Sequence, residues 1–445
     1  MARSPKILLV NPPVYDFTAY DFWLKPYGLL KVAGALRGKA RLELFDFLDR
    51  LHPAVAAAPR KKLRRDAWGR GEYPHCEIPR PAAFSDIPRR YNRFGLEQDV
   101  FTDWLSRHKP FDFALVQTGM TYWYGGVREV IEDIRRISPD TKIVLGGVYA
   151  TLCADHARGL GADLVIEGEK LDPLWSLLPV AGDMAAPPLW EGYDRLETAV
   201  MKLTEGCPFR CTYCAAWRMA PRFSTRPVAT VLDELRHLRK RGARNIAFYD
   251  DALLWQSETA LEPFCCEAIR QGLTEGISFH TPNALHAKWL TPTLARQMVR
   301  AGFESFYLGL ESCSEGWHQR AGGGSKAAKV STDQFACAVE ALRSAGAAPE
   351  NITAYLILGH PNSAGQDLER SMQFACDLGV RIMLAEFSPV PGTPDGQACR
   401  TLVDLNEPLN HNKTAFAIRA LGGGEVNRLK QLARNLNDSL PQTGS

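Results

Sequence analysis

Three cysteines, Cys207, Cys211 and Cys214, stand in the stretch Cys-Pro-Phe-Arg-Cys-Thr-Tyr-Cys. Spacings of three and then two residues let one short loop present three thiolates to a single iron–sulfur cube. A four-iron cluster takes four ligands, so three thiolates leave one iron open, as a catalytic zinc keeps one position open for chemistry. An electron carrier gains nothing from an open iron, whereas an enzyme that holds a small chelating molecule against the cluster does.

The same cysteines have two structural interpretations, a zinc knuckle and a set of buried free thiols. Zinc needs a fourth ligand nearby, and the next histidine, His237, lies inside a predicted helix. Buried thiols do not explain the polar, glycine-containing residues 204–206 that precede the triplet. The pattern therefore favours the cluster.

The second half of the chain alternates strands with helices, which is typical of parallel βα units. The six predicted strands are 199–204, 245–249, 277–280, 305–310, 352–358 and 382–387. Predicted helices lie between them; one begins at Thr291-Pro292 and ends at Gly302. Six units, rather than eight, predict an open, partial (βα)6 TIM-like barrel over residues 195–395, with the cysteine loop at the C-terminal ends of its strands.

Polar groups follow four of these strands at the same end of the predicted barrel. They are Asp250-Asp251, His280 to Asn283, Glu311-Ser312, and the segment Leu358-Gly359-His360. A solvated loop would explain any one of them alone. Four in register with the cysteines predict a ligand site.

The first half predicts a doubly wound, Rossmann-like sheet with strands 6–10, 41–47, 113–117, 142–145 and 164–166. Asn11-Pro12-Pro13, Thr118 and Gly146-Gly147 fall at strand C-termini, where such sheets bind extended ligands. A dinucleotide site would need Gly-x-Gly-x-x-Gly after the first strand, and the chain has Asn11-Pro12-Pro13 there.

The arrangement Cys-x3-Cys-x-aromatic-Cys after a strand resembles the signature of the radical SAM superfamily. The resemblance implies that the open iron binds the amino and carboxylate groups of S-adenosylmethionine (SAM), whose reductive cleavage gives a 5'-deoxyadenosyl radical. It also implies that Tyr213 packs near the adenine, and that Asp250 or Asp251 contacts the methionine amino group. Glu311 would hold the ribose, and the Leu358–Gly359 backbone would lie along the adenine. The family's usual Gly-Gly-Glu at the second strand is absent.

With the first half in front of it, the chain resembles the cobalamin-binding branch of that superfamily, over roughly residues 5–395. The resemblance implies a cobalamin domain over residues 1–185. Its candidate cofactor residues are Asn11, Pro12, Thr118, Tyr122, Gly146 and Gly147.

A histidine-ligated cobalamin would need Asp-x-His-x-x-Gly, and Asp155-His156 does not match this pattern. We therefore expect a cobalamin whose lower face lacks a histidine ligand. The aromatic stretch 122–124 is its candidate neighbour, with core packing as the alternative.

Composition limits the remaining possibilities. The chain has 445 residues, a net charge of +3 and 11 cysteines. This charge predicts no nucleic-acid partner, and no apolar run is long enough for a membrane span. An odd number of scattered cysteines favours a reducing cytoplasm over a disulfide framework. No cysteine follows Cys399, so an auxiliary cluster is not expected, and the absence of a second triplet argues against the methylthiotransferase branch.

Three segments depart from the alternation. Residues 52–100 mix basic and aromatic residues and are interpreted as a lid near the cofactor cleft, with a solvated insertion as the alternative. Residues 322–326, Gly-Gly-Gly-Ser-Lys, lack the strand and spacing of a phosphate loop and predict a flexible connection. Residues 396–445 form a short tail with a helix near 426–436.

The sequence thus predicts a cobalamin-dependent radical SAM enzyme that methylates an unactivated carbon. The alternatives are a non-methylating outcome (cyclisation, rearrangement or hydroxylation) and a non-enzymatic iron–sulfur or corrinoid carrier. An external electron donor of flavodoxin or ferredoxin type is expected. No catalytic side chain can be assigned, and a lipid, a tetrapyrrole, a small metabolite and a peptide all stay open as substrates.

Overall fold

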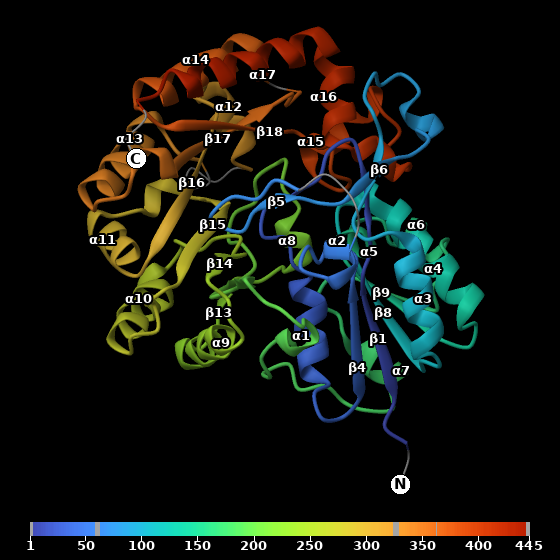
Figure 1. Ribbon diagram of the computed structural model, residues 1–445. Helices are drawn as coiled ribbons and strands as arrows, with labels where there is room; N and C mark the ends of the chain where they lie inside the picture. The colour runs from blue at the N-terminus through green and yellow to red at the C-terminus, as the bar shows by residue number, and fades with distance from the viewer. Residues whose placement is uncertain (1–2, 58–62, 324–328, 362, 442–445) are drawn as a thin grey trace. The chain divides into compact units, whose positions relative to one another are not determined.

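The computed structural model describes residues 3–57, 63–323, 329–361 and 363–441. The chain divides into two compact units, each with one large parallel sheet (Figure 1). Unit 1 comprises Met1–Ala199, His237–Ala243 and Asn406–Leu409; unit 2 comprises Val200–Arg236, Arg244–Leu405 and Asn410–Ser445. The α/β class predicted from the alternation is confirmed. The predicted limits at 185, 195 and 395 stay predictions.

Unit 1 contains a five-stranded sheet in the order β10-β9-β8-β1-β4. Neighbouring strands pair in parallel, so that Asn11 lies opposite Asp46 and Thr118 opposite Gly147. The order reverses between β1 and β8, which is where doubly wound sheets form a ligand crevice. The strands are β1 (Lys6–Asn11), β4 (Arg41–Asp46), β8 (Phe113–Thr118), β9 (Lys142–Gly147) and β10 (Leu164–Ile166).

The central strand β1 is buried on both faces, since Ile7, Leu8, Leu9 and Val10 are all inaccessible to solvent. Such a continuous apolar run is typical of a parallel strand covered by helices on both sides. Leu29, from α1, packs into the same core cluster as Ile7 and Leu9. The helices are α1 (Tyr27–Ala35), α2 (Pro53–Ala57), α3 (Gln98–His108), α4 (Tyr124–Ile137), α5 (Val148–Leu152), α6 (Ala154–Arg158) and α7 (Asp172–Leu177).

The segment 63–97 is more ordered than a solvated insertion. In small antiparallel sheets, β2 (Val14–Asp16) and β6 (His75–Glu77) pair with β7 (Asn92–Phe94), and β3 (Tyr20–Asp21) pairs with β5 (Gly71–Glu72). Its aromatic residues Tyr73, Phe84 and Tyr91 are buried. The buried Arg93 guanidinium lies 2.6 Å from the Glu129 carboxylate of α4. These three aromatic residues therefore contribute to the core, while residues 58–62 of the predicted insertion lie outside the described residues.

The six predicted strands form one sheet in chain order, β11-β14-β15-β16-β17-β18, which lies in unit 2 except for the first two residues of β11. The pairs from β14 to β18 are parallel. The strands are β11 (Thr198–Met201), β14 (Asn245–Phe248), β15 (Ser278–Leu285), β16 (Phe303–Glu311), β17 (Ile352–Leu358) and β18 (Arg381–Glu386). The description of this sheet as a partial barrel stays a prediction.

Helices of unit 2 begin where local chemistry favours them. Thr291 accepts a hydrogen bond from the Leu294 amide, with Pro292 in the first turn, as the sequence predicts. Ser331 and Gln334 form a capping box. The helices are α9 (Val228–Lys240), whose last turn from His237 is assigned to unit 1, α10 (Leu261–Arg270), α11 (Pro292–Arg300), α13 (Thr332–Ser344) and α14 (Gly365–Asp377).

The C-terminal segment packs against the edge of the unit 2 sheet. It contains α15 (Pro394–Ala398), α16 (Lys413–Leu421) and α17 (Gly423–Asp438). The Asn437 amide accepts from the Ile382 N–H at 2.8 Å and donates to the Ile382 carbonyl at 2.9 Å, so it pairs with the edge strand β18. Among the described residues, no helix is both long enough and apolar enough to cross a bilayer.

Candidate active site

The three cysteines lie in a loop, residues 207–214, that we call the cysteine loop. It stands between two short antiparallel strands, β12 (Thr204–Glu205) and β13 (Ser224–Thr225), and leads into α8 (Ala216–Met219). Gly206 begins the turn with φ +73°, and a Cβ there would stand 2.4 Å from the carbonyl oxygen of Arg222. Because only glycine tolerates both conditions, Gly206 fixes how the chain enters the cysteine loop.

The residues after α12 (Glu315–Ala321) close the cysteine loop from the other side. The Thr212 N–H donates to the Ala321 carbonyl at 3.0 Å. A Cβ on Gly323 would lie 1.9 Å from the Arg210 carbonyl oxygen. Ala321 and Gly323 therefore belong to the support of the cysteine loop, whereas residues 324–326 of the predicted flexible connection lie outside the described residues.

The thiols of the cysteine loop are partly buried. Burial raises the pKa of Cys207 to about 12 and that of Cys214 to about 11, so metal binding must displace protons from them. Within the described ranges, no three His, Cys, Asp or Glu side chains converge on a point that would hold one metal ion. Thiolates of a cube bind different irons and stand farther apart than the ligands of one ion, so three thiols on one loop suit a cluster.

Asp250, just beyond β14, is buried and has an unusual set of partners. Its Oδ1 accepts hydrogen bonds from the amides of Leu203 and Thr204 and from the Thr204 hydroxyl. Its Oδ2 is buried without a hydrogen-bond partner among the described residues. Burial raises the pKa of Asp250 to about 6, although Lys202 opposes the shift. An unpaired carboxylate oxygen in this position suits a cationic ligand group. Asp251, the other candidate, is exposed.

Glu311 ends β16 with φ +64° and pairs with Lys329. The Lys329 Nζ lies 2.8 Å from Glu311 Oε2 and 4.5 Å from the centre of the Tyr213 ring, and it also donates to the Tyr213 hydroxyl. Burial opposes ionisation of Glu311, but the Lys329 ammonium outweighs it and the pKa of Glu311 is lowered. Burial raises the pKa of Tyr213 well above its usual value, so the phenol stays neutral. The structure thus brings Tyr213 and Glu311 together around one ammonium group.

Leu358 and Gly359 lie at the end of β17, where Leu358 is fully buried and Gly359 has φ +82°. The next residue, His360, is buried as well and contacts Trp317 and Asp395.

Sequence reasoning missed Lys329, Trp317 and Asp395. No local pattern marks them, because their partners lie far away in the chain: Asp395 accepts a hydrogen bond from Thr212, which lies 183 positions earlier in the sequence.

In unit 1, the predicted cofactor residues contact one another. The Asn11 amide donates to Asp46 at 2.7 Å, and Asn11 and Pro12 line a cavity of only about 50 Å³. Thr118 is buried and donates to the Gly146 carbonyl at 3.0 Å, while Gly147 closely approaches the Thr118 backbone.

The aromatic stretch 122–124 and His156 also contact neighbouring residues of unit 1. The Tyr122 ring is buried and packs edge-on against Trp123, whose indole N–H donates to Asp16 at 2.9 Å. His156 Nδ1 is hydrogen bonded to the Tyr149 hydroxyl.

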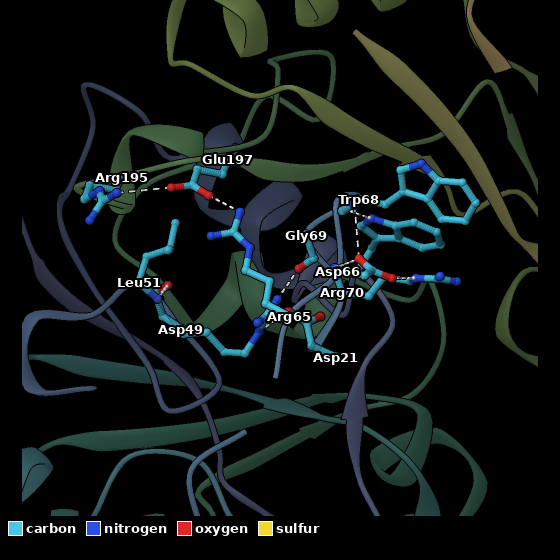
Figure 2. Close-up of polar contacts among 12 residues, drawn as sticks. Asp21, Asp49, Leu51, Arg65, Asp66, Trp68, Gly69, Arg70, Arg195 and Glu197 are labelled. Carbon is cyan, nitrogen blue, oxygen red and sulfur yellow. Dashed lines mark hydrogen bonds and ion pairs between the residues drawn. The ribbon is translucent and has the colours of Figure 1, made fainter. Parts of the chain in front are cut away.

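A much larger cavity, of about 1300 Å³, lies elsewhere in unit 1. It is bounded by residues 49–56 after β4, by residues 63–75 and 96–100, and by Asp21, Lys25, Glu197 and Thr198. Two carboxylates of its lining are paired. Glu197 accepts hydrogen bonds from Arg65 and Arg195 (Figure 2). Asp21 accepts one from Arg50 at 2.7 Å. Beside them, Asp66 holds Arg70 next to Trp68 (Figure 2). Lys25 lines both this cavity and the small one beside Asn11.

Charged groups of both signs line the large cavity, and carboxylates, which accept hydrogen bonds, outnumber the cations. Five carboxylates line it, against the cations Lys25, Arg50 and Arg65. Apolar side chains, among them Leu51, Val55, Leu63, Leu96 and Val100, make up much of the rest. The lining therefore suits a bulky ligand with an apolar body and hydrogen-bond donors, and disfavours a polyanion.

Comparison with known proteins identifies the class. Residues 201–375 match the family model of the radical SAM superfamily, so this chain carries a radical SAM domain, as its cysteine motif predicts.

The fold of nearly the whole chain resembles TsrM from Kitasatospora setae, a radical S-adenosylmethionine methyltransferase solved with cobalamin and a [4Fe-4S] cluster bound. The TM-score is 0.65 at 15% identity, covering 97% of this chain and 91% of TsrM. At this identity the similarity concerns the fold.

The curated relatives match only part of this chain and only part of their own length. The tRNA-2-methylthio-N(6)-dimethylallyladenosine synthase of Chloroflexus aurantiacus is 24% identical over 58% of this chain and 57% of its own. The anaerobic magnesium-protoporphyrin IX monomethyl ester cyclase of Cereibacter sphaeroides is 22% identical over 56% of this chain and 39% of its own. The chain spans less than two thirds of the length of either relative.

Proposed function

We propose that this protein is a radical SAM enzyme that reductively cleaves SAM at a [4Fe–4S] cluster held by Cys207, Cys211 and Cys214. The observation that carries the proposal is the cysteine loop in the same unit as Asp250, whose buried Oδ2 has no partner among the described residues. When bound, the cluster would supply the electron that breaks the bond between the SAM sulfonium sulfur and the 5' carbon of its adenosyl group.

The side chains near the cysteine loop have matching roles. Asp250 Oδ2 would accept hydrogen bonds from the methionine ammonium, which restores a partner to that oxygen. Glu311, kept ionised by Lys329, is a carboxylate acceptor for ribose hydroxyls. Tyr213 and the Leu358–Gly359 backbone would lie along the adenine. Asp251, which is exposed, remains the alternative contact for the ammonium.

Unit 1 would bind cobalamin in its large cavity. About 1300 Å³ exceeds the roughly 300–1,000 Å³ typical of sites for drug-sized ligands, and a corrin is larger than those ligands. The acceptor-rich wall suits the amide side chains of a corrin, and the apolar patch suits its ring. Lys25 links this cavity to the Asn11-Pro12 end of β1, so those predicted residues would flank the cofactor.

The reaction that this arrangement supports best is methyl transfer to an unactivated carbon. The fold similarity to a cobalamin- and cluster-containing methyltransferase supports it. One SAM would supply the methyl group and a second would be cleaved to activate the substrate. An external flavodoxin- or ferredoxin-type donor would deliver the electron.

A non-methylating outcome such as cyclisation is the second candidate, and the similarity to the anaerobic cyclase of Cereibacter sphaeroides favours it. Methylthiotransferases also occur among the relatives. We do not propose their activity, because the 11 cysteines of this chain include one triplet only.

The test is anaerobic purification followed by iron and cobalt analysis and a SAM-cleavage assay with a chemical reductant. Wild type should contain both metals and release 5'-deoxyadenosine, and Cys211→Ala should lose iron and cleavage together. With substrate, a product heavier by one methylene plus S-adenosylhomocysteine supports methyl transfer, whereas 5'-deoxyadenosine alone supports the second candidate. SAM cleavage by Cys211→Ala at the wild-type rate would refute the cluster assignment.

A further inference from the structure

We propose that Thr212, Asp395 and His360 form a positioning network that holds Tyr213 in place and thereby sets the affinity for SAM. This inference rests on the proposed function, since it concerns the adenine side of the proposed SAM site. All three residues, and the residues that they contact, belong to unit 2.

The hydrogen bonds of the network determine where each proton lies. The Trp317 indole N–H can only donate, and it points to His360 Nδ1 at 3.3 Å, so Nδ1 accepts. The ring proton of His360 is therefore on Nε2, which donates to Asp395 Oδ2 at 2.9 Å. The same oxygen accepts from the Thr212 hydroxyl, and the Asp395 N–H donates to the Thr212 carbonyl at 3.1 Å. Thr212 is thus held at two points by one residue.

Most of the network is shielded from water. His360 is 3% and Asp395 7% exposed, their neighbour Trp317 is 1% exposed, and Thr212 is half-buried. Burial opposes ionisation of Asp395, but its bonds to His360 and Thr212 outweigh it, so the pKa of Asp395 is lowered and the carboxylate stays charged. Charge-assisted bonds in such surroundings are stronger and more directional than exposed ones.

A bound cluster would not replace this network. It would fix the sulfur atoms of Cys211 and Cys214, but not the side chains of the two residues between them. The Tyr213 ring instead stacks on Trp317, with centroids 5.8 Å apart, and meets His360 edge-on at 6.1 Å. Trp317 is hydrogen bonded to His360, and His360 is connected through Asp395 to Thr212. The Thr212 backbone and the Tyr213 ring are therefore held by one connected set of contacts.

The test compares Thr212→Val with Thr212→Ser in the anaerobic, cluster-loaded full chain. Valine keeps the size of threonine but removes the hydroxyl, and serine restores it. Thr212→Val should retain iron yet bind SAM about five- to tenfold more weakly, the effect of one lost, partly buried hydrogen bond to a carboxylate. It should also lose part of the change that SAM causes in the EPR spectrum of the reduced cluster. Thr212→Ser should restore both.

A core variant controls for general destabilisation. Phe303 is buried at the start of β16, at the opposite end of that strand from Glu311, and packs against Phe279. Phe303→Leu should lower the melting temperature without weakening SAM binding. If Thr212→Val binds SAM within twofold of wild type, or if Phe303→Leu weakens binding as much, the network does not position Tyr213.

A second pair of variants decides if Thr212→Val fails to hold iron. Glutamine at position 360 has both a donor and an acceptor, whereas leucine has neither. The network predicts that His360→Gln binds SAM severalfold more tightly than His360→Leu, and equal binding by both would overturn it. Absence of SAM binding by iron-replete wild type would refute the proposed function instead.

Discussion

The Lys329 ammonium lies 2.8 Å from the Glu311 carboxylate and 4.5 Å from the centre of the Tyr213 ring. Lys329 is only 7% exposed, so its charge is stabilised by protein groups rather than by water. Burial lowers the pKa of Lys329, but Glu311 outweighs this effect and the pKa is raised. This ion pair holds β16 to the residues that follow the predicted flexible connection.

Breaking the pair should destabilise the protein. Lys329→Met leaves a largely buried carboxylate without its cation, which should lower the free energy of unfolding of the metal-free chain by roughly 2–4 kcal/mol. Urea unfolding followed by circular dichroism would measure it. The double variant Lys329→Met/Glu311→Gln should recover most of the loss, because no buried charge remains. Equal stabilities of Lys329→Met and wild type would contradict this role.

Asp250 should make stability depend on pH. Its pKa in the folded protein is about 6, above the ordinary 3.8, so folding favours its protonated form. The contribution is therefore fully present below about pH 4 and is lost as pH rises through 6, at a cost of roughly 2–3 kcal/mol. Asp250→Asn cannot ionise and should escape this loss. Unfolding of the metal-free wild type and variant between pH 4 and 8 measures it, and a difference independent of pH would show that Asp250 does not titrate in this range.

The same group should make SAM binding depend on pH in the opposite sense. The ammonium group of SAM binds the ionised carboxylate, so affinity for the cluster-loaded protein should fall as pH drops below about 6. Asp250→Asn should bind SAM weakly across the whole range, with a flat profile in equilibrium dialysis. Wild-type affinity in Asp250→Asn would instead favour Asp251 as the contact.

Gly206 should be needed for cluster assembly. Gly206→Ala forces a Cβ against the Arg222 carbonyl at positive φ, so the cysteine loop must shift and iron content should fall to less than about half of wild type. Gly424→Ala is the matched control, because a Cβ there meets nothing within 4 Å and the site lies in α17. It should keep its iron and raise stability slightly. Full iron in Gly206→Ala would show that the cysteine loop tolerates another entry path.

Filling the unit 1 cavity should remove cobalamin binding alone. Ala54 lines the cavity from α2, and Ala54→Trp should weaken uptake of hydroxocobalamin by at least about tenfold through steric exclusion, with iron and SAM binding unchanged. The control Leu402→Trp changes a side chain that is 58% exposed. Titration followed by visible absorbance measures binding. Wild-type uptake by Ala54→Trp would place the cofactor elsewhere, as at the Asn11 end of β1.

The sequence alone determined what depends on neighbouring residues. The cysteine spacing indicates the superfamily, and the confirmed strands follow from short apolar runs bounded by turn residues. The helix that begins at Thr291 and ends before Gly302 follows from capping chemistry, which acts within one turn.

The tertiary structure decided what depends on residues distant in the chain. Lys329 meets Tyr213 across 116 positions, and Asp395 meets Thr212 across 183. The burial of the aromatic residues in 63–97 and the large cavity of unit 1 likewise arise only when separate elements pack together. Periodicity and local spacing carry no information about such encounters, because burial and electrostatic pairing select partners by position in space rather than along the chain.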